Sequence, residues 1–162
     1  MTESTPTPEE LHAVFKQRRE QAVTMPQGNL ALINTSWFYG APNEWESVWG
    51  AGGSWAARAS GEPGVVVKAS AADGVLLNGV VLDGESFAFP KNHETPTEIT
   101  FADGKTGSII VNEEGVYALR VWDPQSEDIQ NFGGIDVFEY NPNWVITGRF
   151  IPIEGGKSVG VE

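Results

Sequence analysis

The stretch Val75-Leu76-Leu77-Asn78-Gly79-Val80-Val81-Leu82 decides the fold class of this sequence. Asn78-Gly79 supplies the positive φ angles of a tight turn, and the apolar residues on either side predict the two arms of an antiparallel hairpin. Similar turn signals punctuate the neighbouring segments at Asp73-Gly74, Asp83-Gly84, Asp103-Gly104 and Glu114-Gly115. We therefore expect a meander of short antiparallel strands.

Further strand patterns lie on the C-terminal side of this hairpin. Thr97 to Phe101 alternates apolar and polar residues, as a half-buried strand does. Ser108 to Val111 and Val116 to Trp122 are expected to pair across the turn between them, and Trp144 to Ile151 is predicted to be the last long strand, before a short tail. Counted from Gly28 onward, the pattern predicts about ten strands.

One helix is expected before the strands, over Thr7 to about Val23. Thr7 and Glu10 form a capping-box pattern, and Pro8 occupies the first helical position. The apolar residues of this segment recur at helical spacing and form one stripe: Leu11, Val14, Phe15 and Ala22. Such a stripe predicts that the helix packs across one face or end of the β structure, while Met1 to Pro6 form a disordered leader.

Composition limits the domain organisation and the partners. A chain of 162 residues with 40% hydrophobic content fits one domain, which we place at residues 7–162, and the absence of cysteine excludes disulfides and thiolate metal sites. A net charge of -12 repels nucleic acid and anionic lipid surfaces, and no apolar run reaches the length of a membrane helix. Met1 to Glu9 does not have the pattern of a signal peptide, which predicts a cytoplasmic protein.

No catalytic, metal or cofactor motif stands out. The two histidines, His12 and His93, lack a metal-ligating neighbour at suitable spacing and are expected at the surface. No serine lies in a nucleophile elbow, and the glycine pairs are not followed by helical patterns that could bind a phosphate. We therefore expect no metal and no cofactor.

Tryptophan and arginine supply the candidate binding site. The sequence has six tryptophans, which in a β domain either fill the core or form platforms for ligands. In the strand ending at Trp122, Arg120 and Trp122 share one face. If the last strands are neighbours, five residues line one pocket for a carboxylate or phosphate: Arg120, Trp122, Asp123, Trp144 and Arg149. The alternative is an Arg-Asp pair that only holds the turn.

The order of several motifs resembles the bacterial proteins grouped as domain of unknown function 1684. The stretches that carry the resemblance span nearly the whole chain: residues 15–20, Pro26 to Leu32 followed by Trp37, Leu119 to Ser126, and Phe132 to Ile135 with Phe138 and Tyr140 to Phe150. The resemblance implies no reaction. Members of that family continue with a second half rich in Gly, Asn-Pro and Cys, so the resemblance implies either a short member or a chain trimmed at a domain edge.

A fainter similarity concerns the turns of forkhead-associated β-sandwiches. Leu76 to Val80 and Leu82 to Glu85 resemble two turns of that fold, which favours an antiparallel β-sandwich or a partly open barrel for this chain. The elements with which those domains bind phosphothreonine are absent, so phosphopeptide binding is not implied.

Two functions remain open from the sequence. The first is a module that binds a small molecule or a protein, because no catalytic pattern is present while the five candidate residues could form a recognition pocket. The second is a hydrolase-like enzyme whose acid and base, Asp123 and Glu139, meet only in three dimensions.

Overall fold

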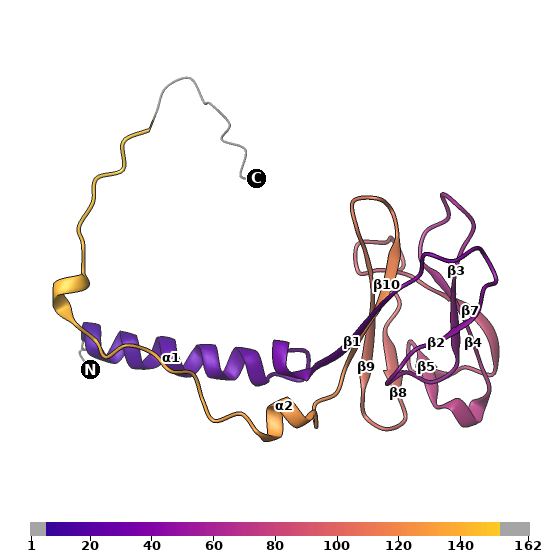
Figure 1. Cartoon of the computed structure of the whole chain (residues 1–162), viewed down its shortest axis with the longest axis horizontal. Helices are drawn as coiled ribbons and strands as arrows, with labels where there is room; N and C mark the ends of the chain where they lie inside the picture. Colours follow the sequence, from indigo (N-terminus) through magenta and orange to yellow (C-terminus); the bar gives the residue numbers. More distant parts are fainter. Residues whose placement is uncertain (1–5, 153–162) are drawn as a thin grey trace, which may run out of the picture.

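The computed structural model describes residues 6–152 and contains a β-sandwich with a long arm (Figure 1). Every strand pairing is antiparallel. One sheet has six strands in the order β1 (Leu32–Trp37), β10 (Tyr117–Trp122), β9 (Thr106–Val111), β8 (Ile99–Phe101), β5 (Val75–Leu77) and β6 (Val80–Val81). The other has four, in the order β2 (Glu46–Ser47), β3 (Ser54–Ala57), β4 (Val65–Ala69) and β7 (Gly84–Ala88). The sequence-based prediction of a mainly β sandwich is confirmed.

The core lies between the two sheets. Its largest fully buried side chains come from both of them: Trp55, Ile99, Ile109, Leu119, Val65, Val67, Val75 and Val121. β-branched and aromatic residues dominate this set, as expected of strands that pack on one another. The core is therefore complete without the arm.

The hairpin that suggested the fold is present. Asn78 and Gly79 have φ angles of 51° and 78°, and Leu77 pairs with Val80 across the turn. β6 is only two residues long and lies at the edge of the six-stranded sheet, so Val80 and Val81 are exposed. The Asn-Gly turn therefore forms as predicted, whereas the second strand of the hairpin, β6, is exposed and not buried in the core.

The arm begins with α1 (Pro8–Thr24), whose predicted start is confirmed. The Thr7 hydroxyl accepts from the Glu10 backbone N–H at 3.2 Å, and the Glu10 carboxylate accepts from the Thr7 backbone N–H at 2.7 Å. At the other end of α1 the chain turns back so closely that Gly28 packs against the last turn of the helix. A Cβ at Gly28 would lie 2.6 Å from the carbonyl oxygens of Ala22 and Val23. Gly28 therefore permits the tight exit that leads through a 3-10 turn (Asn29–Ala31) into β1.

The predicted packing of α1 across the sheet is wrong. α1 projects away from the sandwich (Figure 1), and no residue of α1 is buried. Leu11 and Phe15 are each 54% exposed, and Val14 is also exposed. The physical reason is that the exit at Gly28 directs the helix outward, where neither sheet can reach its apolar stripe.

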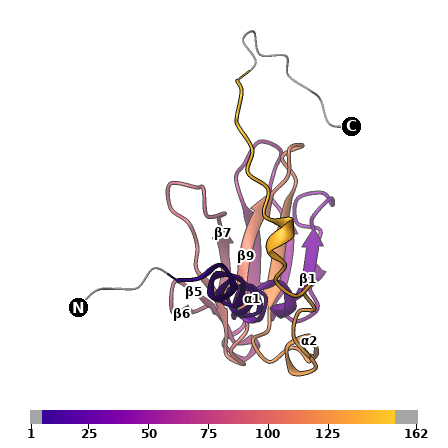
Figure 2. The ribbon, with the colours of Figure 1, turned by 90° about the vertical axis from the view of Figure 1, so that its left-hand side faces the viewer.

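The segment after β10 follows α1 outward, and the predicted strand from Trp144 to Ile151 is also wrong. A short helix, α2 (Glu127–Gln130), turns the chain, and a 3-10 turn (Pro142–Trp144) follows near the far end of α1 (Figure 1). Viewed along the arm, α2 lies below α1 (Figure 2). Residues 145–152 are extended and have no strand partner among the described residues, because the chain has left every sheet edge behind. Residues 135–138 likewise form no strand. The leader and the tail after residue 152 lie outside the described residues, apart from Pro6.

Candidate functional site

The two faces of β10 separate core residues from site residues. Leu119 and Val121 point into the core cluster, and Tyr117 packs against it. Arg120 and Trp122 point to the opposite, outer face of the six-stranded sheet, as the alternation of side chains predicted. Their cross-strand partners on β9 are Ser108 and Thr106, which therefore lie on the same outer face.

Arg120 is the least satisfied polar residue on this face. Its Nε is buried and has no hydrogen-bond partner, and Arg120 forms no ion pair with any described residue. A guanidinium offers five N–H donors in a planar fork that matches a carboxylate or a phosphate. A buried donor without a partner costs about 1–3 kcal/mol, so an acceptor that reached it would be bound favourably.

A groove runs along the outer face from the Ser108 side of Arg120. It has a volume of about 410 Å³, and its polar lining comes from β8, β9 and three loops: Gln27, Asn78, Lys91, Thr97, Glu98, Thr100, Thr106 and Ser108. Gln27 is held there by a 3.2 Å hydrogen bond from its Nε2 to the Thr106 hydroxyl. Two cations, Arg120 and Lys91, and a row of hydroxyl groups thus lie along one face of a chain that is strongly acidic overall.

Asp123 has a local task at the end of β10. Its carboxylate accepts from the Gln125 backbone N–H at 2.8 Å, and its own backbone N–H donates to the Ala31 carbonyl at 2.8 Å. These bonds hold the turn that carries the chain from β10 to α2 and join it to the start of β1. Asp123 forms no ion pair with Arg120, so the alternative of an Arg-Asp pair that holds the turn is not what the structure shows.

Trp144 and Arg149 lie elsewhere. Trp144 belongs to the 3-10 turn at the far end of the arm, where its ring contacts Phe138 edge-on with the centroids 5.6 Å apart. Arg149 is exposed in the extended segment that follows. The five residues proposed from sequence are therefore divided between the sandwich and the arm, since the condition that the last strands be neighbours is not met (Figure 1).

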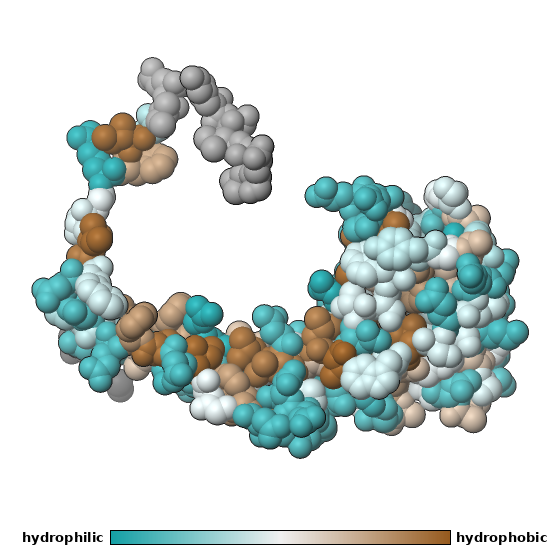
Figure 3. All heavy atoms as spheres, in the orientation of Figure 1, coloured by the Kyte–Doolittle hydropathy of each residue, from teal (hydrophilic) through white to brown (hydrophobic). Residues whose placement is uncertain are grey.

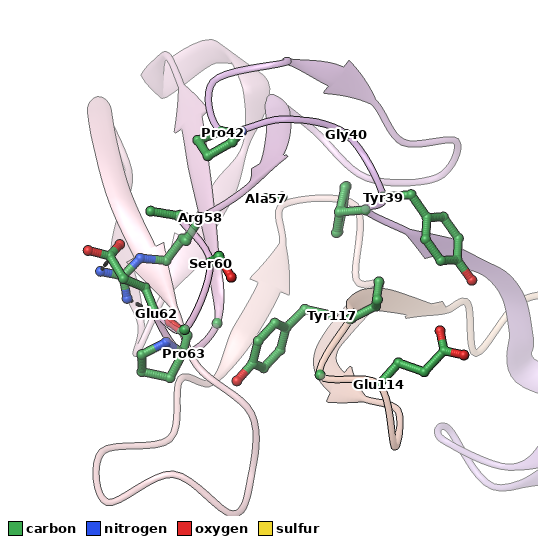
Figure 4. Close-up of a pocket in the computed structure, with 16 residues that line it drawn as sticks. Tyr39, Gly40, Pro42, Ala57, Arg58, Ser60, Glu62, Pro63, Glu114 and Tyr117 are labelled. Atoms are coloured by element: carbon green, nitrogen blue, oxygen red, sulfur yellow. Dashed lines mark hydrogen bonds and ion pairs between the residues drawn. The ribbon is translucent and has the colours of Figure 1, made fainter.

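A second pocket lies at one end of the sandwich (Figure 4). It has a volume of about 540 Å³ and is lined by the loops around Tyr39, Ser60 and Glu114, and by Tyr117. Its one arginine makes several contacts: Arg58 donates to the Pro63 carbonyl at 2.6 Å, pairs with Glu62 at 3.1 Å and lies 4.1 Å from the Phe87 ring centroid, although its Nε, like that of Arg120, is buried without a hydrogen-bond partner. Arg58 therefore braces this loop, and no free cation faces the pocket among the residues that line it.

The six tryptophans divide between the two roles considered from sequence. Trp55 is completely buried in the core, and Trp122 is buried on the outer side of β10. Trp37 and Trp45 are partly buried, whereas Trp49 and Trp144 are largely exposed. The sequence could not distinguish these roles, because burial depends on which sheet face covers each ring.

Two pKa shifts mark the electrostatics of a third pocket, which contains both Asp73 and Asp103. Hydrogen bonds from the backbone and hydroxyl of Ser70 lower the pKa of Asp73. Burial raises the pKa of Asp103, but hydrogen bonds and the charge of Lys105 outweigh this effect and lower it overall. Both carboxyls therefore favour the ionised form, and neither is suited to donate a proton as a general acid near neutral pH.

Within residues 6–152 no cluster of three or more histidine, aspartate or glutamate side chains is arranged to hold a metal ion. None of the helices in the same range combines the length and the apolar character that crossing a membrane requires. No protein-family model, no curated protein and no solved structure matches this chain. The case for function consequently rests on the geometry of the sites.

Proposed function

We propose that this protein is a binding module that holds a small anionic ligand, bearing a carboxylate or a phosphate group, on the outer face of its six-stranded sheet. The observation that supports this proposal most directly is the buried Arg120 Nε without a partner, beside a groove with a volume of about 410 Å³. A buried N–H donor of an arginine without an acceptor destabilises the native state, and a ligand that supplies an acceptor would remove this cost.

In this proposal Arg120 forms a forked pair with the anionic group. Ser108, directly opposite on β9, and Thr106, the next outward residue, offer hydroxyl donors along the same line. Lys91 at the groove adds a second positive charge, and Glu98 beside it disfavours a ligand that is anionic along its whole length. Trp122 lies two residues from Arg120 on the same face and gives the ligand an apolar neighbour.

The alternative of a hydrolase has less support. Its proposed acid and base, Asp123 and Glu139, lie in different places: Asp123 holds a turn at the end of β10, while Glu139 lines a groove on the arm with His12 and Phe15. We therefore favour binding over catalysis.

A thermal-shift and calorimetric titration with inorganic phosphate and with succinate tests the proposal. A ligand present at about a hundred times its Kd stabilises the native state by about 2.7 kcal/mol, so the wild-type Tm should rise with at least one of the two probes. Arg120→Gln should abolish that rise. The matched control is Lys68→Gln, which removes one exposed cation from β4 in the other sheet and should leave the rise intact.

If phosphate raises the Tm and succinate does not, the ligand carries a phosphate group, and the converse result indicates a carboxylate. An equal response in wild type and Arg120→Gln, or no response to either probe at millimolar concentration, contradicts the proposed groove.

Two further parts of the proposal concern family and location. We propose membership of the bacterial proteins grouped as domain of unknown function 1684, supported by the order of the motifs from Phe15 to Phe150. We also propose that the protein acts in the cytoplasm. Detection of the tagged full-length protein in cell fractions tests the second statement.

A further inference from the structure

The helix of the arm is covered on only one side. Four residues of α1 at helical spacing, His12, Lys16, Glu20 and Val23, are partly buried. The segment after α2 lies along this side: the Ile135 backbone N–H donates to Glu20 at 3.1 Å, and the ring centroids of Tyr140 and His12 are 6.1 Å apart. The covered side of α1 is therefore mostly its polar side.

The apolar stripe of α1 faces another direction and stays open. Three residues of the stripe, Leu11, Phe15 and Ala22, together with Arg18 between them, recur at spacings of four, three and four, the spacing found along the seam between paired helices. All four are exposed, and Val14 borders them. Figure 3 shows apolar side chains along the whole of the arm. An amphipathic helix gains most of its stability from packing this face, so the stripe lacks the contact that the sequence encodes.

We infer that the stripe packs against α1 of a second copy of this chain, antiparallel, about a two-fold axis near Phe15. The charges of the helix favour this partner. Its first turn is acidic, with Glu9 and Glu10, whereas Arg18 and Arg19 make its second half basic, where Lys16 and Glu20 pair with each other at 3.9 Å. In an antiparallel pair each acidic start lies beside the basic half of the other helix, and the two helix dipoles are opposed.

The seam residues fit the two-fold axis. Phe15 of each copy lies near the axis, and Leu11 lies opposite Arg18 of the other copy, whose aliphatic stem covers it. The Arg18 guanidinium then reaches toward Glu10 of the other copy. Arg18 has no ion pair among the described residues, so it is available for this contact.

The shape of the molecule permits the pairing. α1 has 17 residues, which corresponds to a length of about 25 Å. The sandwich lies at its C-terminal end only (Figure 1), so antiparallel pairing places the two sandwiches at opposite ends. Beside Phe15, a groove with a volume of about 430 Å³ exposes Phe138, Trp144 and Val145. These side chains widen the apolar contact beyond the helix seam toward the area that a stable dimer needs.

The interface lies on α1 and does not depend on the anionic-ligand groove. Sedimentation velocity of the full chain over a range of concentrations tests it, and the wild type should form a dimer. Leu11→Asp places an unpaired charge in the seam and should raise the dimer Kd by roughly a hundredfold. Ala13→Asp, on the opposite side of the same helix, is the matched control and should leave the dimer Kd within about threefold of wild type.

A charge exchange identifies the second copy as the partner. Glu10→Arg and Arg18→Glu should each weaken the homodimer by roughly tenfold, because like charges then meet at both ends of the pair. Mixing the two variants restores opposite charges at both ends and should produce a heterodimer. Glu10→Arg also breaks the capping box, so Thr7→Ala, which breaks it without reversing a charge, serves as the control and should still dimerise.

A wild type that stays monomeric at hundreds of micromolar overturns the inference, as does a dimer that survives Leu11→Asp. If the wild type dimerises but the two charge variants do not associate on mixing, the helices do not pair in this orientation. None of these outcomes affects the phosphate or succinate titration, whose response depends on Arg120.

Discussion

Arg120 on β10 lies directly opposite Ser108 on β9, and its buried Nε has no hydrogen-bond partner. Cross-strand neighbours on the outer face usually complete one another's hydrogen bonds or are solvated. Here Ser108 is a buried residue and Arg120 is partly buried, and the two side chains form no hydrogen bond that would satisfy the Arg120 Nε. The same geometry that leaves Arg120 unsatisfied is what makes it available to a ligand.

Replacement of this arginine should separate binding from stability. Arg120→Met keeps an apolar stem on the outer face and removes a buried donor that lacks a partner, so the free energy of unfolding should stay within about 1 kcal/mol of wild type or rise. Chemical denaturation measures this change, while the response to phosphate or succinate should be lost. A loss of several kcal/mol would instead show that Arg120 holds the sheet together.

Arg58 should behave in the opposite way. Arg58→Met removes the bond to the Pro63 carbonyl, the pair with Glu62 and the contact with the Phe87 ring. The combined loss should lower the free energy of unfolding by about 1–3 kcal/mol. Lys68→Met on the neighbouring strand β4 is the control and should cost less than about 0.5 kcal/mol. Equal effects of the two substitutions would contradict the bracing role of Arg58.

The sandwich and the arm should contribute unequally to folding. Leu119 is fully buried between the sheets, so Leu119→Ala should cost about 2–5 kcal/mol. Ile146 is 88% exposed in the extended segment, and Ile146→Ala should change the free energy of unfolding by less than about 0.5 kcal/mol. Urea denaturation of both variants at one low protein concentration measures the contrast. A large cost at Ile146 would mean that the segment is packed in solution.

The parts of the fold that the sequence predicted are those set by local chemistry. The Asn78-Gly79 turn, the capping box of Thr7 and Glu10, and the alternation of Arg120 and Trp122 along β10 each depend on a few adjacent residues. Backbone preference and side-chain period determine such features almost alone.

The parts that failed depend on where distant segments meet. The apolar stripe of α1 was sufficient to predict a partner surface, but the crossing at Gly28 decides that this surface is not the sheet of the same chain. Val145 and its neighbours have strand-forming side chains, yet a strand needs an edge to pair with. The groove was missed because Gln27, Lys91 and Thr106 come from three separate segments, with no shared pattern in the sequence.

The carboxylate of Asp73 should leave a signature in the acid stability of the protein. It accepts from the backbone N–H of Ser70 at 2.7 Å and from its hydroxyl at 2.8 Å, and these bonds lower the pKa of Asp73 in the native state. Because the pKa is lower in the folded than in the unfolded chain, ionised Asp73 stabilises the native state above the unfolded value of 3.8. That contribution is lost as the pH falls below 3.8 and through the folded pKa. Asp73→Asn should therefore lower the Tm at pH 6, and the difference in Tm between this variant and wild type should shrink steadily as the pH is lowered below 3.8.

Asp83→Asn, which removes a carboxylate that accepts no hydrogen bond among the described residues, is the control and should show a smaller difference in Tm at pH 6. A gap between wild type and Asp73→Asn that stays constant from pH 6 to the acid limit of folding would mean that the shape of the amide, not the charge of the carboxylate, disturbs the 3-10 turn over Ala71–Asp73.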